Sequence, residues 1–119
     1  MARDHRKLEA FHLADQLALA IYPLTARLPL SEKYGLQSQL RRAAISVATN
    51  IVEGCARESE PDYLRFLDIA LGSSREVLYL ISLTLRLKLL NAADASGALE
   101  LGERVAGALV NLRKSYGRQ

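Results

Sequence analysis

The sequence predicts an all-α protein, an antiparallel up-down four-helix bundle that forms a single domain over residues 1–119. Apolar residues recur at steps of three and four along four long segments, which is the spacing of one face of a helix. No segment alternates apolar and polar residues as a strand would, and no hairpin turn joins two such segments. The connections between the helical segments are short, and short connections join antiparallel neighbours.

The first expected helix covers residues 7–28 and is apolar on two sides, so it needs more than one partner surface. Pro23 lies inside it and lacks a backbone N–H, so we expect a kink near Ile21 and Tyr22. Pro29 should end the helix. The two apolar stripes contain Phe11, Ala14, Ala18, Ile21, Thr25 and Leu28 in one and Leu13, Leu17, Ala20 and Leu24 in the other.

The second expected helix covers residues 33–57, with Ser31 as its N-cap. It carries an apolar and a polar stripe side by side, with small residues between them that let another backbone approach closely. We therefore expect it to be the central packing element and to hold polar groups at a contact surface. The stripes are Leu36, Leu40, Ala43, Val47, Ile51 and Gly54, and then Gln39, Arg42, Ser46, Asn50, Glu53 and Arg57.

The third and fourth expected helices cover residues 61–89 and 95–116. Ser59 offers an N-cap to the third helix, and Asn91 or Asp94 offers one to the fourth. The third helix has a seam of apolar residues in strict three-four alternation, typical of a bundle. A neighbouring stripe is apolar apart from Glu76 and the small polar Ser73. Three glycines weaken the fourth helix, which tertiary packing must therefore hold.

Composition excludes several classes of protein. The formal net charge of +3 permits nucleic-acid binding without requiring it, and the absence of tryptophan leaves a stacking platform for single strands poorly supplied. One cysteine excludes an internal disulfide and fits the cytoplasm. Two histidines and no paired-cysteine motif argue against a metal site, and nothing indicates a cofactor. There is no apolar run long enough for a membrane span and no secretory signal.

Three segments carry a resemblance to a known family: KLEAFHLADQLALAIY, LPLSEKYGLQSQLRRAAISVATNIVEGCAR and YLRFLDIALGSSREV. Over about residues 7–90 the chain resembles the small four-helix-bundle proteins encoded in intervening sequences of bacterial 23S rRNA genes. That family is similar in fold to the accessory protein of diversity-generating retroelements, a barrel-like homopentamer that binds nucleic acid and associates with a reverse transcriptase.

The resemblance implies a homo-oligomer, a pentamer, and a non-enzymatic accessory role with nucleic acid or a protein such as a reverse transcriptase as partner. This chain is much less basic than those accessory proteins, so we expect any RNA or DNA binding to be weak and nonspecific in sequence. The alternative is a purely structural scaffold for protein assembly. An enzyme has the least support, and we expect no catalytic residue. Excess apolar surface on the first three helices predicts that they form the oligomer contacts.

The candidate contacts to nucleic acid or a partner are Arg42, Arg57, Arg113 and Lys114. For the arginines of the second helix, internal ion pairs or subunit contacts are the alternative. We expect Arg41, Asn50, Glu53 and Glu76 to form a structural polar network. Within it, Glu76 should be buried and paired with Arg41 before Arg42, in the same chain or in the next subunit. Cys55 is expected to fill the core.

Overall fold

The computed structural model describes residues 3–116 as a bundle of four helices. None of these residues lies in a β-strand, so the all-α prediction is confirmed. The helices are α1 (Glu9–Thr25), α2 (Ser38–Cys55), α3 (Glu60–Arg86) and α4 (Ala92–Lys114). Three short helical turns accompany them, η1 (His5–Lys7), η2 (Leu30–Glu32) and η3 (Lys33–Gln37).

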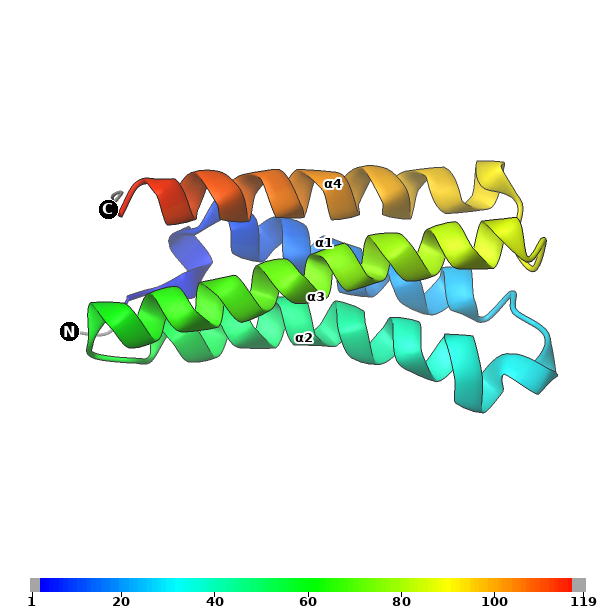
Figure 1. Cartoon of the computed structure of the whole chain (residues 1–119), viewed down its shortest axis with the longest axis horizontal. Helices are drawn as coiled ribbons and strands as arrows, with labels where there is room; N and C mark the ends of the chain where they lie inside the picture. Colours follow the sequence, from blue (N-terminus) through cyan, green and yellow to red (C-terminus); the bar gives the residue numbers. More distant parts are fainter. Residues whose placement is uncertain (1–2, 117–119) are drawn as a thin grey trace.

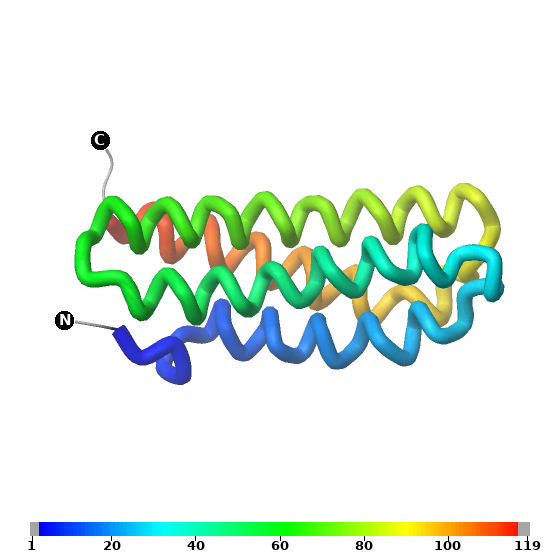
Figure 2. The backbone as a smooth tube through the Cα atoms, turned by 90° about the horizontal axis from the view of Figure 1, so that it is seen from below, coloured from blue at the N-terminus to red at the C-terminus, as the bar shows by residue number. Residues whose placement is uncertain are grey.

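The helices run alternately up and down along a molecule of 45 × 22 × 22 Å (Figure 1). α1 packs against α2 and α4, and α3 packs against the same two helices. Both views place the connections α1–α2 and α3–α4 at one end of the bundle (Figures 1 and 2). We name this the turn end (residues 26–37 and 87–91). The opposite, terminal end holds residues 3–8, 56–59 and 115–116.

All four helices contribute fully buried side chains to one core, which is what their apolar stripes predict. Burying each large aliphatic side chain contributes about 1.5–3 kcal/mol, before the entropy lost on folding is counted. Close approach also matters in this core. A Cβ atom added to Gly54 would lie 2.8 Å from the Cβ of Phe66, so α2 and α3 meet there without room for a side chain. The largest buried aliphatic residues are Leu17, Ile21, Leu40, Ile51, Leu67, Ile81 and Leu109.

The helix starts follow capping chemistry at two of three expected sites. The hydroxyl of Ser59 accepts from the N–H of Asp62 at 3.2 Å, and the Asn91 side chain accepts from the N–H of Asp94 at 2.8 Å. Asn91 therefore starts α4 at Ala92, three residues before the expected position. The third expected cap, Ser31, is wrong.

Glu32 takes the place of Ser31, because its carboxylate accepts from the N–H of Leu36 at 3.1 Å and supports η3. The backbone then breaks at Gly35 (φ −108°, ψ −108°), outside the helical region. α2 begins only at Ser38, five residues later than the expected 33. The long second segment of the sequence is thus a wide turn followed by a helix.

The ends of α1 and α3 also differ from the expected bounds. α1 stops at Thr25, two residues after Pro23, rather than continuing to residue 28. α3 stops at Arg86, and the backbone N–H of Leu89 donates to the carbonyl of Thr84 at 3.1 Å. This closing turn places Lys88 at φ 61°, in the left-handed region that glycine usually occupies.

A candidate interaction site at the turn end

Arg41 is fixed against the last turn of α1. Its Nε donates to Thr25 Oγ1 at 2.8 Å, and Nη2 donates to the carbonyl of Tyr22 at 3.1 Å. The guanidinium also lies 4.3 Å from the centroid of the Tyr22 ring. Gln37 Nε2 donates to the carbonyl of Thr25 at 3.1 Å. Helix C-termini leave carbonyls without partners, so these two side chains of the second segment cap α1.

The expected pair of Glu76 with Arg41 is wrong within this chain. Glu76 is exposed, and no hydrogen bond or ion pair joins it to Arg41 in residues 3–116. The reason is that α2 separates them, because Arg41 turns towards α1 while Glu76 borders the opposite flank of α2. Ile69, in the same stripe as Glu76, is also exposed. That stripe lies at the edge of the core, where a carboxylate reaches water.

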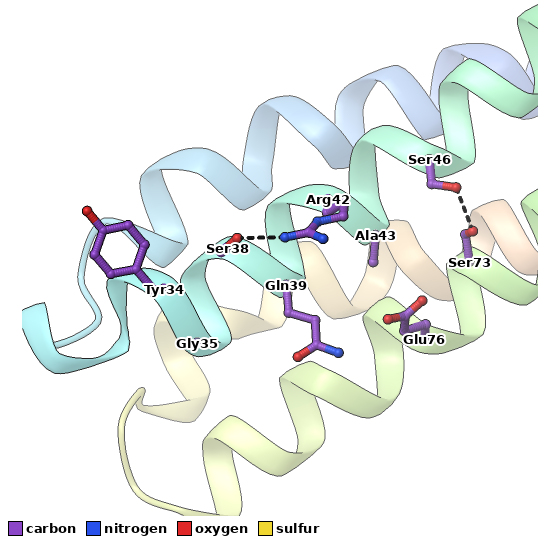
Figure 3. A pocket seen from close by; sticks show the side chains of 9 residues that line it. All are labelled: Tyr34, Gly35, Ser38, Gln39, Arg42, Ala43, Ser46, Ser73 and Glu76. Carbon is purple, nitrogen blue, oxygen red and sulfur yellow. Dashed lines mark hydrogen bonds between the residues drawn. The ribbon is translucent and has the colours of Figure 1, made fainter.

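A short polar network does connect α2 and α3. The hydroxyls of Ser46 and Ser73 share a hydrogen bond of 2.8 Å, drawn in Figure 3. Asn50 Nδ2 donates to the Ser46 carbonyl at 2.8 Å and to its hydroxyl at 2.9 Å. Asn50 is half-buried, whereas Glu53 is exposed. The two serines were not among the residues expected in the network. Ser46 lies in the polar stripe of the second helix and Ser73 in the stripe of Glu76, and two small residues at such positions indicate that the helices can approach closely there.

Two open hollows flank the first turns of α2. The tyrosine hollow, towards α1, measures about 390 Å³, and the serine hollow, towards α3, about 380 Å³. Tyr34, Ser38 and Arg42 border both, so they form a ridge between them (Figure 3). The tyrosine hollow is completed by Tyr22, Lys33, Gln37, Arg41 and Ile45. The serine hollow is completed by Gly35, Gln39, Ala43, Ser46, Ser73 and Glu76.

The two hollows differ in charge. Lys33, Arg41 and Arg42 border the tyrosine hollow, and no carboxylate borders it among the described residues. The serine hollow is bordered by one cation, Arg42 on α2, and one carboxylate, Glu76 on α3, among the described residues (Figure 3). Nη2 of Arg42 donates to the hydroxyl of Ser38 at 3.1 Å, and the guanidinium is otherwise exposed. The tyrosine hollow therefore has a cation beside each of its two rings, Lys33 at Tyr34 and Arg41 at Tyr22.

The structure does not bring the four expected contact residues together. Arg42 lies near the turn end, whereas Arg57, Arg113 and Lys114 lie at the terminal end. Arg113 Nε is 3.0 Å from Asp68 Oδ1, and the guanidinium of Arg57 lies 4.9 Å from the Phe66 ring centroid. Further ion pairs at that end join Arg6 to Asp4 at 2.9 Å and Arg65 to Asp62 at 3.6 Å.

A buried cluster at the terminal end has no accessible nucleophile. The guanidinium of Arg3 lies 3.9 Å from the centroid of the Tyr63 ring, and the backbone N–H of Arg3 donates to the carbonyl of Cys55 at 2.8 Å. Burial raises the pKa of the Cys55 thiol, and burial beside Tyr116 raises the pKa of Tyr63. Both groups stay protonated at neutral pH, so this cluster supports packing rather than chemistry.

These features define the class of protein as an all-α four-helix protein with an exposed polar end. The family model described as 23S rRNA-intervening sequence protein matches residues 6–111, so the chain belongs to this family. The sequence resemblance is thereby confirmed. A comparison with curated proteins gave no match.

A solved structure shares the fold. It is the crystal structure of a protein with unknown function from the S23 ribosomal protein family of Bacteroides thetaiotaomicron, with a TM-score of 0.81. The two chains are 21% identical over 88% of this chain and 98% of that one. In the described part of this chain, every helix is too short or too polar to cross a membrane.

Proposed function

We propose that this chain is a non-enzymatic accessory protein that binds nucleic acid weakly and without sequence specificity, as a homo-oligomer. The observation that carries the proposal is the tyrosine hollow, where three cations and two tyrosines meet without a carboxylate. Phosphates supply most of the affinity in nonspecific binding, and cations that are not already paired supply the contacts. We place the contact at Arg42 and Lys33 rather than at the terminal end, where carboxylates accompany Arg113 and its neighbours.

Fluorescence anisotropy with labelled RNA and DNA at several salt concentrations tests this proposal. We expect the logarithm of the binding constant to fall linearly with the logarithm of salt concentration. Arg42→Ala should weaken binding and flatten this slope, because it removes a phosphate contact. Lys114→Ala, at the other end, is the matched control and should change neither. Equal losses for both variants would argue against a site at the turn end.

A second candidate function is a structural scaffold for assembly, and the exposed apolar side chains favour it. Among residues 3–116 the exposed large hydrophobic side chains lie on α1, α2 and α3 and in the α1–α2 and α3–α4 connections, and none lies on α4. Such a distribution supports subunit contacts through the first three helices, in a ring such as the pentamer that the resemblance implies. These residues are Leu19, Tyr22, Leu30, Tyr34, Ile45, Ile69, Tyr79 and Leu87.

Analytical ultracentrifugation at micromolar concentration measures the assembly directly. A species several times heavier than the 13.1 kDa chain is expected, and Leu19→Glu should reduce its mass. A monomer would contradict both the proposed pentamer and the scaffold function. A reverse transcriptase is the protein partner that the resemblance implies. Its retention on the immobilised oligomer, with an unrelated polymerase as control, tests that part of the proposal.

A further inference from the structure

We infer that the nucleic acid bound at the turn end is single-stranded, with an unpaired base stacked on Tyr34 and its phosphates held by Lys33 and Arg42. This inference rests on the proposed function, because it names the class of nucleic acid that the same site takes. It comes from the geometry of the ridge, where Tyr34 and Arg42 both border the two hollows.

Tyr34 has the exposure of a stacking residue. Its side chain is 88% exposed, and Figure 3 shows the ring pointing away from α2 and α3. The η3 turn holds it there, since the backbone break at Gly35 separates Tyr34 from the regular helix. Lys33 Nζ lies 5.6 Å from the ring centroid, which keeps a cation beside the ring. An aromatic ring this exposed contributes little to folding, but it can stack on any base.

Tyr22 is a second, less accessible ring in the same hollow. It is 42% exposed, and the guanidinium of Arg41 covers one of its faces at 4.3 Å. Because Arg41 is tied to Thr25 and to the Tyr22 carbonyl, this arrangement is fixed before any ligand arrives. Arg41 is therefore a positioning residue, and Lys33 and Arg42 remain to contact phosphates.

Duplex nucleic acid cannot use these rings. Paired bases are stacked on one another, so their faces are closed to a side chain unless the helix opens. A ring standing next to cations favours a strand whose bases are already unpaired. The accessible ring of Tyr34 is what favours a single strand, because the cations alone would hold a duplex or an acidic peptide equally well.

Glu76 determines on which side of the ridge the phosphates should lie. It borders the serine hollow, where Arg42 is the one cation among the described lining residues. A carboxylate repels phosphates, so the phosphates should lie on the tyrosine side of the ridge. Glu76→Gln, which keeps the shape and removes the charge, should therefore tighten binding by about two- to fivefold at low salt.

Anisotropy with a fluorescein-labelled oligo(dT) of about 12 nucleotides, against a labelled duplex of the same length, tests the inference. We expect tighter binding of the single strand. Tyr34→Leu should weaken it by about 5- to 150-fold, the range that loss of one stacked base produces, and Tyr34→Phe should bind normally. Tyr79→Leu is the matched control, since Tyr79 is an exposed tyrosine that borders neither hollow. Circular dichroism confirms that each variant folds.

The outcomes separate the inference from the proposed function. Equal binding of duplex and single strand, with Tyr34→Leu silent and Arg42→Ala weakened, would overturn the inference and leave the proposed function standing. Binding of neither nucleic acid would overturn both. Displacement of oligo(dT) by polyglutamate at equal charge concentration would also overturn the inference, because it would show a site that recognises charge alone.

Discussion

Most of the arginines near the two ends of the bundle have different kinds of partner. At the terminal end Arg6, Arg65 and Arg113 each have a carboxylate partner within 4 Å. At the turn end Arg27 is also paired, with Asp94 at 3.2 Å, but Arg41 caps a helix and Arg42 has only a serine hydroxyl as its described partner. A carboxylate beside a surface cation offsets its positive potential and repels a phosphate, so such a cation attracts an anionic ligand less. The partners of the arginines, rather than their number, therefore locate the candidate site.

The largest expected change in stability comes from substitution of Arg41. Arg41→Ala removes a charged donor from Thr25, whose side chain is fully buried, and from the Tyr22 carbonyl. We expect a loss of about 1–3 kcal/mol in the free energy of unfolding, measured by urea denaturation. Arg113→Ala, its counterpart at the terminal end, should cost at most about 1 kcal/mol because its ion pair is exposed. Similar losses for the two variants would contradict the difference between the ends.

A smaller effect, of opposite sign, is expected at Lys88. Its φ of 61° is unfavourable for a residue with a side chain, so Lys88→Gly should raise the free energy of unfolding by about 0.5–1 kcal/mol. Glu58→Gly, in the α2–α3 connection of the terminal end, is the control. Glu58 does not have a positive φ, so this change should lower stability slightly. A stabilised Glu58→Gly, or a destabilised Lys88→Gly, would refute the backbone argument.

The smallest effect concerns the ion pairs of the terminal end at low pH. Arg6 donates two side-chain hydrogen bonds to Asp4 and lowers the pKa of that carboxyl from 3.8 to about 2. Because the folded pKa is the lower one, the contribution of this pair is present above pH 4. It is lost as the pH falls through about 2. Carboxyl chemical shifts followed by NMR should show this midpoint, and Arg6→Gln should return it towards 3.8.

Helical periodicity predicted the number and order of the helices, but not their ends. The stripes around Leu40 and Ile51 depend on spacing alone, and spacing is visible in the sequence. The start of α2 depends on which side chain reaches an open N–H, and here Glu32 replaced Ser31. Both choices are chemically reasonable, so sequence alone could not decide between them.

The candidate site was predicted only in part. Its residues lie at the margins of the apolar stripes, and the sequence does not show where the buried part of a helix face ends. Arg42 was a candidate from the start. The exposure of Glu76 was missed, since periodicity gives the direction of a side chain but not the place where the core meets water. The place of Tyr22 and Tyr34 in one hollow was missed as well, because it depends on the turn at Gly35, which interrupts the helical pattern.

The contacts of Arg41 also bear on the order in which the chain folds. They join residues only 16 and 19 positions apart, whereas the Arg113–Asp68 pair spans 45 positions. Closing the shorter loop loses less chain entropy, so α1 and α2 should associate before α4 docks. We therefore expect Arg41→Ala to slow refolding in stopped-flow experiments and Arg113→Ala mainly to speed unfolding. On this view, the α1–α2 hairpin acts as a nucleus whose exposed ridge is formed early, before the bundle closes.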